Sequence, residues 1–164
     1  MFAGTNIESV MHNNPSKIKA IIFDWGRTLH DPDIDSLFPG TQEVLEELSK
    51  KYTLALVTLA KSQSPEYRRK TIKESGIKPY FRAIVIGNEE KDKLYEEALK
   101  ELALLPENVV VVDDRTIRGI SWGNRSGAMT IWMRRGKFAE ELPTIETGDP
   151  THTITDLSAL TRIL

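Results

Sequence analysis

Four polar features of the chain come directly after short apolar runs, where α/β proteins usually carry their chemistry. Asp24 ends the first run and Thr58 ends the second. Two lysines open the helical segment that follows the third run, and a pair of acids ends the fourth. Each feature alone is more often structural, as a turn cap or a solvated charge. Together, carboxylates, a hydroxyl and an ammonium at one sheet edge predict a site for a metal ion and a phosphoryl group.

The segments between these residues alternate between strand-like and helix-like patterns. Short apolar runs rich in β-branched residues predict buried strands at residues 18–25, 53–58, 83–87, 109–112 and 129–133. Apolar residues at helical spacing predict helices at residues 41–51, 65–75, 93–102, 116–126 and 156–164. This order predicts a Rossmann-like, three-layer α/β/α fold, in which helices cover both faces of a central, mainly parallel sheet of about five strands.

Length and composition limit the class of protein. The 164 residues predict a single domain over residues 18–164, preceded by a flexible N-terminal extension over residues 1–17. The formal net charge of −2 argues against bulk binding of nucleic acid, and the absence of cysteine excludes disulfides and cysteine metal sites. No apolar run is long enough to span a membrane, and the N-terminus lacks a signal-peptide pattern. We therefore expect a cytoplasmic protein without membrane attachment.

The ordered strand-end residues resemble the motifs of the haloacid dehalogenase-like superfamily over most of the chain. The first family motif is an apolar strand followed by D-x-D-G-T-L, and "IIFDWGRTL" supplies Asp24 and Thr28. The second motif is a strand ending in Thr or Ser, which "TLALVT" matches at Thr58. The third is a lysine just before a helix, for which Lys91 is the first choice and Lys93 the alternative.

The fourth family motif is a strand, an acid, a second acid about one turn later, a small-residue helix and a glycine. Counting back from "SGAMTIWM" places Asp114 on the first acid and Asp113 on a position usually held by glycine. A shift of one residue would make Asp113 the metal ligand, so both acids are candidates. The second acid of the motif would fall on Gly119 and is therefore missing.

The resemblance implies a Mg²⁺-dependent phosphatase in which Asp24 attacks phosphorus and forms an aspartyl-phosphate intermediate. It implies three side chains that bind the phosphate of the substrate: Thr28, Thr58 and Lys91. It implies a Mg²⁺ site formed by Asp24, the backbone carbonyl of Gly26, and Asp114 or Asp113.

Two positions of the first motif depart from the family pattern. Phosphatases of the family carry a second aspartate two residues after the nucleophile, as general acid and base, and this chain has Gly26 there. Such a group typically contributes about 10²–10⁴-fold in rate. The following loop offers three candidate replacements: His30, Asp31 and Asp33. The next family position, usually glycine, is Arg27, which would be strained at positive φ unless Gly26 takes the strained conformation instead.

The short gaps between the motifs predict a member without a cap domain and with an open site. We expect a phosphorylated substrate, either a small molecule or a macromolecule, and a homo-oligomer that helps to close the site. Six basic residues are candidates for a basic rim, although solvated surface charges are the favoured interpretation: Arg68, Arg69, Lys70, Arg134, Arg135 and Lys137.

Other functions stay open at this point. Without the general acid, the chain could cleave a substrate whose leaving group needs no proton, such as an acyl phosphate. The main alternative is a catalytically impaired domain that binds Mg²⁺ and phosphate, or regulates, without turnover. Cleavage of C–halogen or C–P bonds and a flavodoxin-like nucleotide-binding module rank lower, the latter because no Gly-rich loop follows the first strand.

Overall fold

The computed structural model describes residues 17–164, so the predicted extension lies outside the described residues apart from Lys17. One sheet of six parallel strands runs through the molecule in the order β5-β4-β1-β6-β7-β8. Its strands are β1 (Ala20–Asp24), β4 (Thr53–Leu59), β5 (Phe81–Gly87), β6 (Val109–Asp113), β7 (Met129–Met133) and β8 (His152–Ile154). The chain builds outward in opposite directions on the two sides of β1, which is where ligands gather in open α/β sheets.

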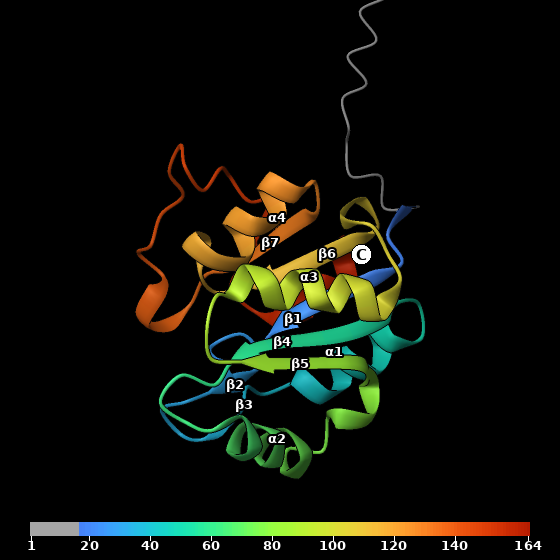
Figure 1. Cartoon of the computed structure of the whole chain (residues 1–164), viewed down its shortest axis with the longest axis vertical. Coiled ribbons are helices and arrows are strands. Elements are labelled where there is room, and N and C mark those ends of the chain that lie inside the picture. The colour runs from blue at the N-terminus through green and yellow to red at the C-terminus, as the bar shows by residue number, and fades with distance from the viewer. Residues whose placement is uncertain (1–16) are drawn as a thin grey trace, which may run out of the picture.

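Helices cover both faces of the sheet, as the sequence predicts (Figure 1). Helices α3 (Lys91–Leu102) and α4 (Ser121–Ser126) pack on one face over side chains such as Ile22 and Val111. The other face carries α1 (Thr41–Ser49), α2 (Pro65–Glu74) and the short C-terminal α5 (Leu160–Ile163). The three-layer α/β/α architecture is therefore confirmed.

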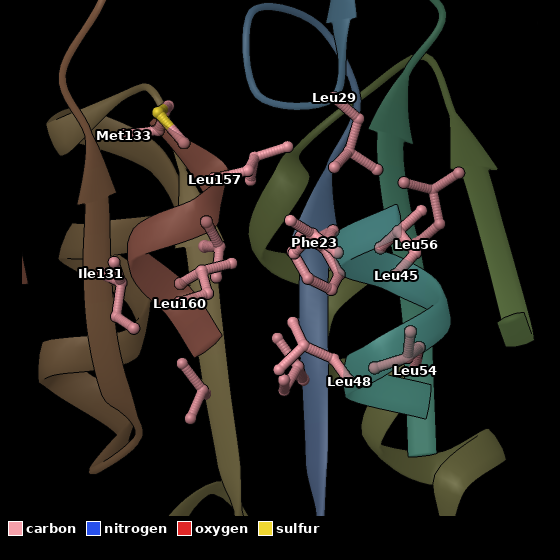
Figure 2. Packing of buried hydrophobic residues seen from close by; sticks show 14 of the residues in the cluster. Phe23, Leu29, Leu45, Leu48, Leu54, Leu56, Ile131, Met133, Leu157 and Leu160 are labelled. Atoms are coloured by element: carbon pink, nitrogen blue, oxygen red, sulfur yellow. The ribbon is translucent and has the colours of Figure 1, made fainter. Parts of the chain in front are cut away.

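Two apolar clusters hold the layers together. Figure 2 shows the larger one, in which Leu45 and Leu48 of α1 and Leu160 of α5 face Phe23 in the middle of the sheet. Alternate residues of β1 point to opposite faces, so Phe23 joins this cluster and Ile22 joins the other. Both faces of β1 are buried, so the strand and the carboxylate at its end are held in a fixed position.

Local signals account for the best-predicted helix. The Ser64 side chain accepts a hydrogen bond from the backbone N–H of Tyr67 at 3.1 Å, and Pro65 occupies the first helical position of α2. Gly76 follows the helix with φ of 83°, a left-handed conformation that favours glycine. The sequence therefore predicts the first and last residues of this helix to within about one residue.

The structure adds four features to the sequence-based prediction. Strand β8 lies within residues 134–154, and β2 (His30–Asp31) and β3 (Ser36–Leu37) form a small antiparallel hairpin after β1. The predicted helix over residues 116–126 begins as a π-helical turn, Thr116–Ile120, and becomes α-helical only in α4. Short 3₁₀ turns account for further connections: Lys78–Tyr80, Pro106–Asn108, Gly136–Phe138 and Leu157–Ala159.

Within residues 17–164, every helix is too short or too polar to span a lipid bilayer.

Candidate functional site

The carboxyl ends of three neighbouring strands bring together the residues singled out by the sequence. Strand β1 lies between β4 and β6 in the sheet. Asp24 ends β1, Thr58 lies near the end of β4, and Asp113 ends β6. Lys91 begins α3 and completes the group. All four side chains belong to buried residues. In Figure 1 this edge of the sheet lies where the arrowheads of β4 and β5 point.

Lys91 joins the two strand-end acids. Its Nζ donates to Asp24 Oδ1 at 2.5 Å and to Asp113 Oδ2 at 2.7 Å. Burial by itself would lower the pKa of Lys91, but the two carboxylates outweigh burial and raise it, so the ammonium keeps its charge. The alternative lysine, Lys93, is exposed and lies 3.7 Å from Glu90 at the surface of the same helix.

Both oxygens of the Asp113 carboxylate accept hydrogen bonds from neighbouring donors. Its Oδ2 also accepts from the Tyr95 hydroxyl at 2.6 Å and from the Gly119 N–H at 3.0 Å, and its Oδ1 accepts from the Arg115 N–H at 3.0 Å. Burial alone would raise the pKa of Asp113, but Lys91 and these hydrogen bonds outweigh burial and lower it. Asp113 is therefore an ionised partner that fixes Lys91.

The position of Asp113 also accounts for the missing second acid of the fourth motif. A Cβ atom at Gly119 would lie 2.4 Å from Asp113 Oδ2 and 2.5 Å from the Tyr95 hydroxyl. The carboxylate of Asp113 therefore occupies the space in which a side chain at position 119 would begin. Sequence analysis missed Tyr95 as a site residue, because its helical spacing also suits an apolar core position.

Asp114 follows the strand end and has a different environment. Trp132 Nε1 donates to its backbone carbonyl at 3.0 Å, which fixes the main chain, while the described residues give its carboxylate no such ammonium partner. Burial, and then the nearby Asp24 and Asp113, raise the pKa of Asp114 to about 10. Burial and Asp113 likewise raise the pKa of Asp24, although Lys91 opposes the shift.

These three acids form a donor set that suits a hard divalent cation. One oxygen from each of Asp24, Asp113 and Asp114 can be chosen so that all lie within 4.8 Å of one another. Three buried carboxylates face a single ammonium, so the cluster has an excess of negative charge that keeps protons bound. A divalent cation with oxygen ligands would remove that excess, and the residues present therefore fit one.

The loop after β1 places the remaining residues of the first motif. Thr28 Oγ1 donates to Asp24 Oδ2 at 3.0 Å, so both oxygens of this carboxylate are oriented. Arg27 itself adopts the left-handed conformation, with φ of 60°, whereas Gly26 is not among the positive-φ residues. The alternative that Gly26 takes the strained conformation is therefore wrong. The turn is closed by the Arg27 N–H, which donates to the His30 carbonyl at 2.7 Å.

An open cavity of about 260 Å³ lies beside Asp24 and Asp114. A Cβ atom at Gly26 would meet no atom within 4 Å, so the space where the family carries its general acid is empty of protein. None of the three proposed replacement acids lines this cavity. His30 stacks on Trp25 and bonds to Asp35 Oδ1 at 3.0 Å, and burial lowers its pKa despite that partner.

Many of the side chains that line the cavity are cationic. Only some of them are among the six basic residues named from the sequence. Of the six predicted basic residues, Arg68 and Lys137 line the cavity. Arg135 is directed instead to the Thr28 carbonyl at 2.9 Å and packs over Phe38. Four further cations of the lining were not predicted for the rim: Arg27, Lys61, Arg115 and Arg118. They come from loops and from the π-helical turn Thr116–Ile120, and the sequence does not distinguish their charges from solvated ones.

A protein-family model and two named relatives match the chain. A family model described as haloacid dehalogenase-like hydrolase matches residues 2–133. A glyceraldehyde 3-phosphate phosphatase of Pyrococcus furiosus is 28% identical over 133 residues, which is 77% of this chain and 53% of that protein. The protein of the same name from Methanopyrus kandleri is 38% identical over 73 residues, 42% of this chain and 31% of its own. The chain thus spans about half, or less, of these relatives.

A solved structure supports the fold. A haloacid dehalogenase-type hydrolase from Bacillus subtilis, solved bound to magnesium, superposes with a TM-score of 0.74 at 14% identity. The superposition covers 89% of this chain and 98% of that one. At this identity the likeness concerns the arrangement of the strands and helices.

Proposed function

This chain belongs to the haloacid dehalogenase-like hydrolase family, and on that premise we propose that it is a Mg²⁺-dependent phosphatase with Asp24 as its nucleophile. The observation that carries the proposal is the contact of Asp24 with both Lys91 and Thr28 at the mouth of a cation-lined cavity. The names of the two matched relatives favour phosphate ester hydrolysis over C–halogen cleavage.

In the proposed reaction a carboxylate oxygen of Asp24 attacks phosphorus, and the bond from phosphorus to the leaving oxygen breaks. The leaving oxygen takes the electron pair, and an aspartyl-phosphate remains on Asp24. Water then attacks phosphorus, Asp24 departs as a carboxylate, and inorganic phosphate is released. Thr28 and Lys91 orient the attacking carboxylate, and Lys91 and Thr58 bind phosphate oxygens as charge develops on them.

We assign the Mg²⁺ site to Asp24, Asp114 and the backbone carbonyl of Gly26. Among residues 17–164, none donates a hydrogen bond to that carbonyl, and Gly26 lines the same cavity as Asp24 and Asp114. Asp113 is the weaker candidate because Lys91 and three other donors already occupy its oxygens. When bound, Mg²⁺ would reduce the repulsion between the anionic nucleophile and the anionic phosphate.

The empty space beside Gly26 bears on which leaving groups the enzyme accepts. Apart from Asp24 and Asp114, the described side chains that line the cavity include no carboxylate and no imidazole to protonate a leaving oxygen. We therefore propose acyl phosphates, or other esters whose leaving group is stable as an anion, as the best substrates. The lack of a proton donor also favours a second candidate function: a domain that binds Mg²⁺ and phosphate with little turnover.

The test is a panel of alkyl, aryl and acyl phosphates assayed with Mg²⁺, with Asp24→Asn as the control. We expect turnover that requires Asp24 and is fastest on acyl phosphates. Binding of Mg²⁺ and fluoroberyllate without turnover on any member of the panel would favour the non-catalytic domain. Failure to bind either would contradict both functions.

Three further expectations from the sequence stay predictions: the lack of a cap domain, a homo-oligomeric state and a cytoplasmic location. Between β1 and β4 the chain forms the β2–β3 hairpin and α1, and between β4 and β5 it forms α2 and one 3₁₀ turn. These short segments support a site that is open to solvent on the side of the cavity.

A further inference from the structure

Besides Lys91, six cationic side chains line the cavity beside Asp24, which is more than one phosphate ester requires. They are Arg27, Lys61, Arg68, Arg115, Arg118 and Lys137. Two of them are matched by carboxylates: Arg115 Nε lies 2.8 Å from Glu141 Oε2, and Arg27 NH1 lies 3.7 Å from Asp33 Oδ2. The other four form no ion pair with a carboxylate among the described residues.

These unmatched cations lie close enough to affect one another. Burial lowers the pKa of Lys61, and Arg118, Arg115, Lys91 and Lys137 lower it further through their charges. Lys61 also has φ of 52°, a left-handed conformation that is unfavourable for a lysine. The free protein therefore holds mutually repelling charges together around Lys61, whose backbone conformation is strained. An anion bound there would relieve the repulsion.

The wall that carries Lys137 is held in place. Phe138 follows Lys137 in the short turn after β7, and the guanidinium of Arg115 lies 3.7 Å above its ring. Glu141 ties the same segment to the π-helical turn, because Thr116 Oγ1 donates to its backbone carbonyl at 2.9 Å. The turn that carries Lys137 is therefore tied to the π-helical turn that carries Arg118.

The balance of charge indicates what the cavity can bind. With a divalent cation in place, three carboxylates and the Lys91 ammonium form a neutral inner cluster. The reacting phosphate of a monoester carries about two negative charges, which two of the four unmatched cations would neutralise. Two cations are left without a partner, and Arg guanidinium groups suit phosphate oxygens. A cavity of about 260 Å³ suits a small molecule.

We propose that the substrate is a small phosphate ester that carries a second phosphate group, held by Arg118 and Lys137 while Asp24 attacks the first. This inference rests on the proposed phosphatase function and specifies its substrate class. The second phosphate would be bound by side chains outside the nucleophile and metal cluster, so substrate binding and chemistry can be changed separately.

The test compares two probes that differ only in the second phosphate: propane-1,3-diol monophosphate and propane-1,3-diol bisphosphate. Calorimetry with Mg²⁺ on the full chain, as the Asp24→Asn variant, measures binding without turnover. We expect the bisphosphate to bind at least about tenfold more tightly than the monophosphate. One hydrogen bond to a charged group typically contributes enough binding free energy for a tenfold change in affinity.

Matched variants locate the effect. Arg118→Gln and Lys137→Gln should each weaken bisphosphate binding by about tenfold and change monophosphate binding by less than about threefold. Lys100→Gln, an exposed cation in the last turn of α3, is the control and should change neither affinity. Circular dichroism and thermal unfolding establish that each variant is folded.

Three results would overturn the inference. Equal affinity for the two probes, or no binding of either, would show that the second phosphate is not recognised. Loss of both affinities to the same extent in Arg118→Gln and Lys137→Gln would mean that these residues serve the reacting phosphate. Tighter binding of a 5′-phosphorylated oligonucleotide than of the bisphosphate would indicate a nucleic-acid end as the ligand. Turnover by the wild-type chain is measured separately and decides the proposed phosphatase function independently.

Discussion

The hydroxyl of Tyr95 offers a direct measure of how firmly the site is built. This hydroxyl is fully buried and donates to Asp113 Oδ2 at 2.6 Å, the oxygen that also accepts from Lys91 Nζ at 2.7 Å. Tyr95→Phe removes that donor and keeps the ring, which stacks on Trp122 with the centroids 4.8 Å apart. The substitution therefore tests one hydrogen bond with little change in packing.

The expected loss follows from the charge on Asp113. A hydrogen bond to an ionised group contributes roughly 1.5–3 kcal/mol, more than one between neutral groups. Asp113 Oδ2 keeps two donors after the substitution, Lys91 and the Gly119 N–H, so its solvation is reduced and not abolished. We expect a loss of about 2 kcal/mol in the free energy of unfolding, which moves the urea midpoint by roughly 1 M.

Urea unfolding at several pH values is the assay, with the exposed Tyr67→Phe as the control, for which we expect a change within about 0.5 kcal/mol. The pKa of Asp113 is lowered in the folded protein, so its stabilising effect is present above the unfolded value of 3.8 and is lost as the pH falls below that value. The difference between wild type and Tyr95→Phe should shrink over the same range. A loss below about 0.5 kcal/mol at neutral pH, or one that does not shrink in acid, would refute the reasoning.

Four more predictions concern the glycines and the metal. Gly119→Ala should cost about 1–3 kcal/mol in urea unfolding, because its Cβ would lie 2.4 Å from Asp113 Oδ2, whereas Gly26→Ala, with no atom within 4 Å, should change stability by less than about 0.5 kcal/mol. Equal costs would mean that the Asp113 carboxylate does not fill the space beside Gly119. Gly26→Asp should raise the turnover of alkyl phosphates by about 10²–10⁴-fold, because their leaving group needs a proton. The turnover of acyl phosphates, whose leaving group needs none, should rise much less. A variant that folds and binds Mg²⁺ but shows no gain on alkyl phosphates would contradict this expectation. Mg²⁺ binding at pH 7 should release about one proton from Asp114, because the pKa of this residue is raised to about 10. Calorimetry in two buffers of different ionisation enthalpy measures the release, and the Asp114→Asn variant should release no proton. The raised pKa also means that the metal-free protein should lose stability as the pH rises from about 4 towards about 10, and added Mg²⁺ should restore it.

The order of strands and helices, and the edge at which the site lies, follow from the sequence itself. Runs such as "VVVV" before Asp113 are apolar on every residue, which is typical of strands buried on both faces of a parallel sheet. In such a sheet the carboxyl ends of the strands share one edge, so Asp24, Thr58 and Asp113 had to meet. Helix α2 was predictable for a local reason as well, because Ser64 caps its first turn. Strand β8 was missed because it has three residues, of which Ile154 alone is buried.

Only the tertiary structure decided which charges face the site and which acid takes which role. A lysine or arginine in a loop or a helical turn has the same local pattern whether it lies in solvent or at a cavity, so Lys61 and Arg118 gave no signal in the sequence. The roles of Asp113 and Asp114, adjacent in the chain, are separated by their partners: Lys91 and Tyr95 hold the first, and burial beside other acids protonates the second. Periodicity records whether a side chain is buried, whereas the energy of a charge depends on the groups that distant segments place beside it.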